Sequence, residues 1–337
     1  PPKEKFSSIL YQKHISDEEY ERAKDVWQKC KCKTFQDYHD IYLKLDVLLL
    51  ADCFEKYRSV FIEKHEIDPC YCFSAPGLTW QCGLKQTGIE LDLLDDYDML
   101  LMIENGIRGG FSGVLGSRHV KANNKYLSNY NPSKESNFLL YLDANNLYGW
   151  AMSQKLPTGD FKWETDENYY LNFPEGRGWF IEADLEYPDD VKMKTAKFPL
   201  LPEKIKVELD DLGEYQLNML QDENLSKAEK LILNLKDKSK YVIHHQILKF
   251  YIEMGIKVKK VCRTISFEES EWLKQYIDTN TKERSKSKTD FEKNLWKLLN
   301  NSFYRKTMEN IRGRMNITFV STDEEAKSIS PNQHSKM

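Results

Sequence analysis

Asp143 follows an apolar run at residues 138–142 and precedes Ala-Asn-Asn. The run predicts a buried strand at residues 138–143, and the asparagines predict a turn into a helix that begins near Asn145. A carboxylate at the end of a strand, followed by backbone carbonyls and by helical N–H groups, suits a hydrated Mg²⁺ that carries a polyphosphate. The alternative is an aspartate that caps a surface helix.

A second group of residues recurs at helical spacing. Lys293, Lys297, Asn301 and Tyr304 share one face of a predicted helix. The opposite face is apolar and is expected to pack; its members are Phe291, Leu295, Leu298 and Leu299. Transfer of a phosphoryl group depends mainly on positioning and charge stabilisation. Two lysines one turn apart, an amide and an aromatic ring are therefore candidates for holding a nucleoside triphosphate.

Charge is unevenly distributed along the chain. Residues 226–315 contain 21 Lys and Arg against 11 Asp and Glu, whereas the whole chain has a net charge of −4. A basic segment of this kind, with Lys257, Lys259 and Lys260 as one cluster, attracts phosphate and so favours binding to nucleic acid. The alternative is a set of solvated helix faces.

Two motifs in order resemble those of a known enzyme family. Asp143-x-x-Asn-Leu147-Tyr148-Gly resembles motif A of family B DNA polymerases, in the protein-primed branch of viruses, linear plasmids and self-synthesizing transposons. Downstream, Lys297-x-x-x-Asn301-Ser-x-Tyr resembles motif B of the same branch. The pair in this order is specific, whereas the first motif alone is less so.

The resemblance extends upstream of motif A. Arg108-Gly109-Gly110 is similar to the Tyr-x-Gly-Gly linker between exonuclease and palm, with Ile107 at the aromatic position. Tyr42-x-x-x-Asp46 is similar to the third exonuclease motif. Arg305 departs from the family, which has a glycine there to let the helix approach the template closely; the arginine indicates either decay of the site or a contact with template phosphate.

The resemblance implies a role for each matched residue. Asp143 is the catalytic residue and, with the carbonyl of Ala144, a metal ligand for Mg²⁺, of which the complete enzyme uses two ions. Tyr148 packs under the sugar and excludes a 2′-hydroxyl. The implied dNTP contacts are Leu147, Tyr148, Arg284, Lys293, Lys297, Asn301 and Tyr304. The implied DNA contacts are Arg108, Gly109, Gly110 and Ser302, and the exonuclease remnant is Tyr42 and Asp46.

The fold class implied is α+β, as a fragment of a right-hand polymerase. The expected parts are the C-terminal remainder of a ribonuclease-H-like exonuclease domain (1–85), a linker with the Gly-Gly motif (86–137), a palm with an inserted segment (138–265), two-helix fingers with motif B (266–315) and a disordered tail (316–337). Residues 179–186 alternate as a half-buried strand does, which predicts Glu182, Asp184 and Glu186 on its wet face.

Exonuclease motifs I and II and the Tyr-x-Asp-Thr-Asp of palm motif C do not occur in these 337 residues. We therefore expect an incomplete DNA-directed DNA polymerase with little activity alone. The second hypothesis is a catalytically dead transposon- or virus-derived remnant that binds nucleic acid or nucleotide. The partners implied are a DNA primer-template, dNTPs and a terminal priming protein. No signal peptide or membrane span is evident, which predicts an intracellular protein of the nucleus or cytoplasm.

Overall fold

The computed structural model describes residues 2–8, 10–113, 120–165, 176–220, 227–314 and 319–329. The chain divides into two compact units, Pro1–Cys82 and Gly83–Met337, which are described separately. Within the described ranges, no helix is both long enough and apolar enough to cross a membrane.

The first unit is helical, and side chains fix where its helices begin. α1 (Asp17–Lys29) starts at Ser16, whose hydroxyl accepts from the N–H of Glu19 while the Glu19 carboxylate accepts from the N–H of Ser16. α2 (Phe35–His65) starts with the same arrangement between Thr34 and Asp37. The remaining elements are η1 (Lys3–Phe6), η2 (Pro69–Tyr71) and α3 (Ala75–Thr87), which continues into the second unit.

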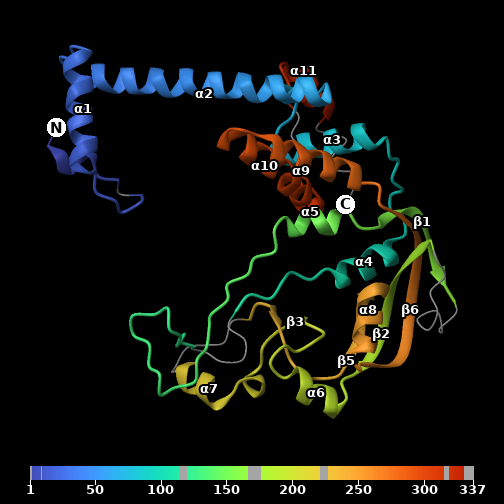
Figure 1. Cartoon of the computed structure of the whole chain (residues 1–337). Helices are drawn as coiled ribbons and strands as arrows, with labels where there is room; N and C mark the ends of the chain where they lie inside the picture. The colour runs from blue at the N-terminus through green and yellow to red at the C-terminus, as the bar shows by residue number, and fades with distance from the viewer. Residues whose placement is uncertain are drawn as a thin grey trace. The chain divides into compact units, whose positions relative to one another are not determined.

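The second unit is built on a four-stranded antiparallel sheet in the order β1-β6-β2-β5 (Figure 1). Its strands are β1 (Leu156–Glu164), β2 (Arg177–Glu186), β5 (Lys238–His244) and β6 (Lys257–Ser270). β6 is the longest strand and lies between β1 and β2. The expected strand at residues 179–186 is thus confirmed within β2.

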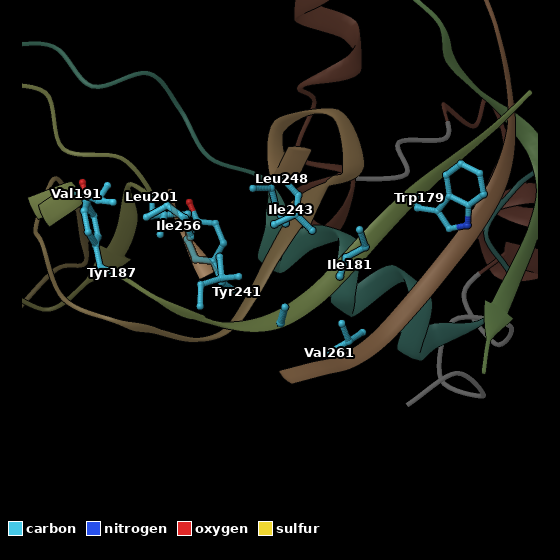
Figure 2. Packing of buried hydrophobic residues seen from close by; sticks show 12 residues of the cluster. Trp179, Ile181, Tyr187, Val191, Leu201, Tyr241, Ile243, Leu248, Ile256 and Val261 are labelled. Carbon is cyan, nitrogen blue, oxygen red and sulfur yellow. The ribbon is translucent and has the colours of Figure 1, made fainter. Parts of the chain in front are cut away.

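Helices cover both faces of this sheet. Tyr241 and Ile243 of β5 belong to a large apolar cluster with Leu248 of α8 (His245–Glu253), drawn in Figure 2. Val242, between them, points to the other face, where it packs with Met99 and Met102 of α4 (Tyr97–Gly106). Because successive strand residues point to opposite faces, one apolar run serves both clusters.

An inserted segment lies between β2 and β5. Its elements are α6 (Asp189–Thr195), β3 (Glu203–Ile205), η4 (Leu209–Asp211), α7 (Glu214–Leu220) and β4 (Lys230–Ile232), with β3 and β4 paired as a separate sheet. The assignment of this segment to an insertion in a palm stays a prediction.

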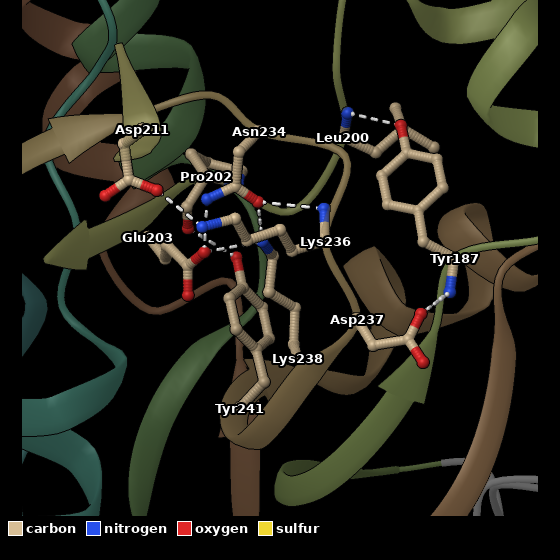
Figure 3. A network of polar contacts seen from close by, with 10 residues as sticks. All are labelled: Tyr187, Leu200, Pro202, Glu203, Asp211, Asn234, Lys236, Asp237, Lys238 and Tyr241. Carbon is tan, nitrogen blue, oxygen red and sulfur yellow. Dashed lines mark hydrogen bonds and ion pairs between the residues drawn. The ribbon is translucent and has the colours of Figure 1, made fainter. Parts of the chain in front are cut away.

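A polar network ties the inserted segment to β5 (Figure 3). Lys238, only 3% exposed, donates to the Glu203 carboxylate at 2.6 Å and to the side-chain oxygen of Asn234. The Tyr241 hydroxyl donates to the carbonyl of Pro202 at 2.8 Å. Burial lowers the pKa of Lys238, and its carboxylate partner opposes that effect.

The remaining helices are α5 (Leu147–Met152), α9 (Lys274–Lys286), α10 (Asp290–Thr307), η5 (Ile311–Gly313) and α11 (Asp323–Ile329). α9 and α10 form the helix pair expected between residues 266 and 315. β6, however, continues to Ser270, so the first residues of that range belong to the sheet.

Two predicted elements are wrong. Residues 138–143 form no strand: they are exposed and extended, and the nearest bridge joins Asn123 to Asn137. A strand needs a neighbouring strand for its backbone hydrogen bonds, and none of the described residues supplies one here. The polar tail was expected to be disordered, but residues 323–329 form α11, whose first turn is acidic and whose start is capped by Thr322. Residues 316–318 and 330–337 lie outside the described residues.

The acidic side of β2 also differs from expectation. Glu182 is buried rather than wet, and its carboxylate accepts two hydrogen bonds from Arg263 at 2.9 and 2.7 Å. Asp184 accepts from the backbone N–H of Lys240 at 2.8 Å. The two carboxylates of β2 thus accept hydrogen bonds from both neighbouring strands, Glu182 from β6 and Asp184 from β5.

Candidate nucleotide site

α5, which follows Asp143 in the chain, contacts α10, which carries the second predicted group (Figure 1). The rings of Tyr148 and Tyr304 stack with centroids 4.2 Å apart and planes 20° apart. The Tyr148 side chain nevertheless stays 51% exposed. One face of its ring is therefore used by Tyr304, while part of the residue remains open to a ligand.

α10 presents the second group because its other face is buried. It starts at Thr289, which shares a capping box with Glu292. Buried positions lie along its inner side: Leu295, Trp296, Leu299, Asn300, Ser302 and Phe303. Lys293 and Lys297 are exposed, whereas Asn301 and Tyr304 are half-buried. Of the apolar residues expected to pack, Leu295 and Leu299 do so, but Phe291 and Leu298 are exposed.

The cations of the two helices are available to an anion. Lys293 approaches Asp290 at 3.8 Å, a loose surface pair. Lys297 and Arg284, both exposed, form no ion pair with any described residue. The charges of Lys297 and Arg284 are therefore not compensated by an ion pair with a described residue.

Asp143 and Ala144 are exposed in an extended segment that leads to α5. Asn146 adopts a left-handed conformation, φ 53°, that turns the chain into the helix, and Leu147 is its first residue. Among the described residues no three His, Cys, Asp or Glu side chains gather as a metal site. Asp143 and one carbonyl would supply two of the six oxygen ligands of Mg²⁺, so water and a bound triphosphate would have to supply the others. The residues present therefore do not fit a complete metal site.

Residues 3–336 match the family described as DNA polymerase type B, organellar and viral. The chain belongs to this family. Two solved structures of Phi29 DNA polymerase are similar at low identity. The orthorhombic crystal form is 15% identical with a TM-score of 0.46, covering 86% of this chain and 47% of that one. The complex with primer-template DNA and incoming nucleotide substrates is 16% identical with a TM-score of 0.43, covering 89% and 42%.

The chain thus spans less than half the length of these structures. A comparison with curated proteins found no match. Enzymes of family B generally use divalent metals.

Gly109 and Gly110 follow α4, and Arg108 before them contacts β5. The Arg108 guanidinium donates to the carbonyls of Val242 at 2.8 Å and Gly106 at 3.2 Å, and lies 3.8 Å from the Tyr241 ring centroid. Burial lowers the pKa of Arg108. Gly109 and Gly110 are exposed, and a Cβ added to either would meet nothing within 4 Å. Arg108 therefore stabilises the contact between the end of α4 and β5, whereas Gly109 and Gly110 are accessible to a ligand.

The other predicted residues differ in how far they are open to a ligand. Ser302 is 2% exposed, so its hydroxyl does not reach the surface, and we leave it out of the DNA interface. Tyr42 and Asp46 are exposed one turn apart on α2, in the first unit. Arg305 is exposed on α10 beside Tyr304 and does not disturb the helix.

One structural contact of the motif B helix was missed by sequence reasoning. Asn280 of α9 donates to the side-chain oxygen of Asn300 at 2.9 Å, and both residues are buried. A signal was present: Asn300 shares a helical face with Trp296 and Phe303, and an amide on an apolar face requires a polar partner. This pair joins α9 to α10 by a buried hydrogen bond.

Proposed function

We propose that this chain is the nucleotide-binding part of a protein-primed, DNA-directed DNA polymerase, which extends a 3′-hydroxyl by nucleotidyl transfer. The observation that carries the proposal is the stack of Tyr148 on Tyr304. It joins motif A to motif B, 154 residues apart from Asp143 to Lys297. The lysines of motif B then stand on the same helix face as one ring of the stack.

The roles follow from the chemistry of each group. Lys293 and Lys297 neutralise the triphosphate, and Arg284 adds a third cation from the neighbouring helix. Asn301 and Tyr304 contact the base. Leu147 and the open part of Tyr148 limit the space at the sugar, which disfavours a 2′-hydroxyl.

Mg²⁺ is the metal that we propose, with two ions in the complete enzyme, where it supplies charge stabilisation at the transferring phosphate. Asp143 and the carbonyl of Ala144 are the ligands that this chain would contribute. Because they do not form a complete site, the lysines must carry most of the affinity for nucleotide in this chain.

We propose further partners from the same family assignment. A DNA primer-template would follow Gly109, Gly110 and the basic segment, and a terminal protein would dock on the inserted segment. The domain division stands as a proposal, with an exonuclease remainder (1–85) that includes Tyr42 and Asp46, a linker (86–137) and a palm. The fingers begin after Ser270, because β6 extends that far.

Calorimetric titration of the full chain with Mg²⁺–dATP tests the nucleotide site. We expect weak binding that falls by about tenfold or more in Lys297→Ala, since a charged contact with phosphate contributes about 1.5–3 kcal/mol. Asp143→Ala should also weaken binding. Lys194→Ala, at an exposed lysine of α6, is the matched control and should bind as the wild type does. Equal affinity for wild type and Lys297→Ala would show that the site is wrongly placed.

A second candidate function is binding of nucleotide and nucleic acid without turnover. Arg305 at the glycine position and the lone carboxylate of Asp143 favour it. A primer-extension assay on the same preparation separates the two. Binding of Mg²⁺–dATP with no extension, also in Arg305→Gly, supports the second candidate, and any extension that Asp143→Ala abolishes supports the polymerase.

A further inference from the structure

Residues 123–137, between the Gly-Gly linker and motif A, form a loop that is closed by asparagine side chains. At its base, Asn123 and Asn137 pair through their backbones at 2.8 and 3.2 Å. The side-chain oxygen of Asn137 also accepts from the N–H of Asn123 at 2.6 Å. We call these residues the asparagine loop.

Asn123 holds the interior of the asparagine loop together. Its side-chain nitrogen lies within hydrogen-bond distance of the carbonyls of Asn131, Lys134 and Glu135, at 3.0, 3.3 and 3.0 Å. Its side-chain oxygen accepts from the N–H of Asn131 at 2.9 Å. Asn124, which is buried, donates to the carbonyl of Asn137 at 3.1 Å. The loop is therefore ordered by polar contacts rather than by an apolar core.

This ordered scaffold displays aromatic and basic side chains. Tyr126 is 77% exposed, and Tyr130 is also exposed. The ammonium of Lys125 lies 5.3 Å from the centroid of the Tyr126 ring. Lys121 and Lys134 are exposed as well, and the exposed Glu135 is the one acidic residue from 120 to 137. The loop combines exposed aromatic rings with an excess of positive charge.

We propose that the asparagine loop binds single-stranded nucleic acid, with bases stacked on Tyr126 and Tyr130 and phosphates contacted by Lys121, Lys125 and Lys134. Exposed rings interleaved with lysines match the chemistry of an unpaired strand, whose base faces are open and whose backbone is anionic. A duplex hides its base faces, so it would use the lysines but not the rings. The fixed loop lowers the ordering cost of binding.

This inference rests on the proposed function only in one respect: the bound nucleic-acid strand would be the template or the primer. Its test is fluorescence anisotropy of a labelled oligothymidylate with the full chain. Tyr126→Ala should weaken binding by about fivefold or more, because stacking on an aromatic side chain contributes about 1–3 kcal/mol per base. Tyr126→Trp should restore it. Tyr71→Ala, at an equally exposed tyrosine of η2, is the matched control and should have no effect.

Asn123→Ala supplies an independent arm, since it removes the loop's hydrogen bonds but no surface group. We expect weaker oligothymidylate binding together with faster amide hydrogen exchange across residues 124–136. Unchanged affinity in both Tyr126→Ala and Tyr126→Ala with Tyr130→Ala would overturn the proposal. Loss of duplex binding in Lys125→Ala without any effect of the tyrosines would also overturn it, in favour of a backbone contact.

Titration of the same variants with Mg²⁺–dATP distinguishes this proposal from the proposed function. The Tyr126 variants should bind nucleotide as the wild type does. Lys297→Ala should lose nucleotide while retaining the oligothymidylate. Failure of only one titration therefore identifies which of the two proposals is wrong.

Discussion

Tyr148 stacks on Tyr304, and we propose that its open part contacts a nucleotide. A stacked pair at 4.2 Å contributes stability beyond its buried area. The stack fixes the ring of Tyr148 without using its hydroxyl group in the ring–ring contact. Stacking on Tyr304 therefore orients the Tyr148 ring. Steric exclusion of a 2′-hydroxyl, in contrast, would depend on the size of the Tyr148 side chain.

A substitution series at Tyr148 tests this separation. Tyr148→Ala should reduce the preference for dATP over ATP by about tenfold, since a small group in a pocket changes affinity by about 1–3 kcal/mol. Tyr148→Phe keeps the ring and should keep the preference. Competition binding of the two nucleotides measures the ratio. A preference that is the same in all three proteins would remove Tyr148 from the sugar site.

Individual site residues could be predicted from the sequence where they belong to a motif or recur with the helical period. Lys293, Lys297 and Tyr304 could be placed on one helix face because the helical period determines it. The contact between Tyr148 and Tyr304 could not be derived from spacing, since it depends on how α5 packs against α10. Burial of Glu182 was missed because alternation along a strand does not tell whether its second face is covered.

Among the elements, the inserted segment depends on one buried lysine. Lys238 lies on β5 and its partner Glu203 on β3, so their ion pair connects two sheets. The pair is partly desolvated, and removal of one partner leaves an uncompensated charge. Lys236 and Asp211 make a more exposed pair in the same network.

We expect Glu203→Ala to lower the free energy of unfolding by about 3 kcal/mol, because it leaves the Lys238 ammonium buried and unpaired. Glu203→Ala combined with Lys238→Met should recover much of this loss. Lys236→Met, at the exposed pair, should change stability by less than about 1 kcal/mol. Urea unfolding followed by circular dichroism measures all three. A larger effect for Lys236→Met than for Glu203→Ala would contradict the assignment of Lys238 as the buried member.

Elements with local signals were predictable from the sequence. The capping box at Ser16 and the alternation in β2 depend on neighbouring residues only, and both elements are present. α4 likewise begins at a local signal, because the Asp96 side chain caps it and the preceding residues are extended. The strand at residues 138–143 failed because strand formation requires a partner that the apolar pattern does not specify.

For the molecule as a whole, we expect acid stability to depend in part on two adjacent histidines, where β5 ends and α8 begins. His245 accepts from the backbone N–H of Trp179 at 3.2 Å through Nδ1, and His244 accepts from that of Gln246 at 3.4 Å. Burial lowers the pKa of each to about 4, and for His245 the neighbouring His244 lowers it further. Both Nδ1 atoms must be unprotonated to accept these bonds.

The sign of the pH dependence follows from these pKa values. Between about pH 6.5 and pH 4 the unfolded chain binds protons that the folded chain does not, so stability falls as the pH falls through this window. The loss should be on the order of 2 kcal/mol per histidine. His245→Gln should flatten the dependence of Tm on pH, whereas His39→Gln, at an exposed position of α2, should not. An equally steep profile in His245→Gln would contradict this origin.

The position of β6 has a consequence for synthesis. β1 pairs with β6 and not with β2, although β1 and β2 are consecutive along the chain. β1 therefore has no strand to bind until residues 257–270 have emerged from the ribosome. Pairing across so many residues carries a loop-closure cost and is slow. The nascent chain thus presents β1 as an unpaired strand throughout translation of the inserted segment. The sheet is completed only when β6, its last strand in the sequence, pairs with both β1 and β2.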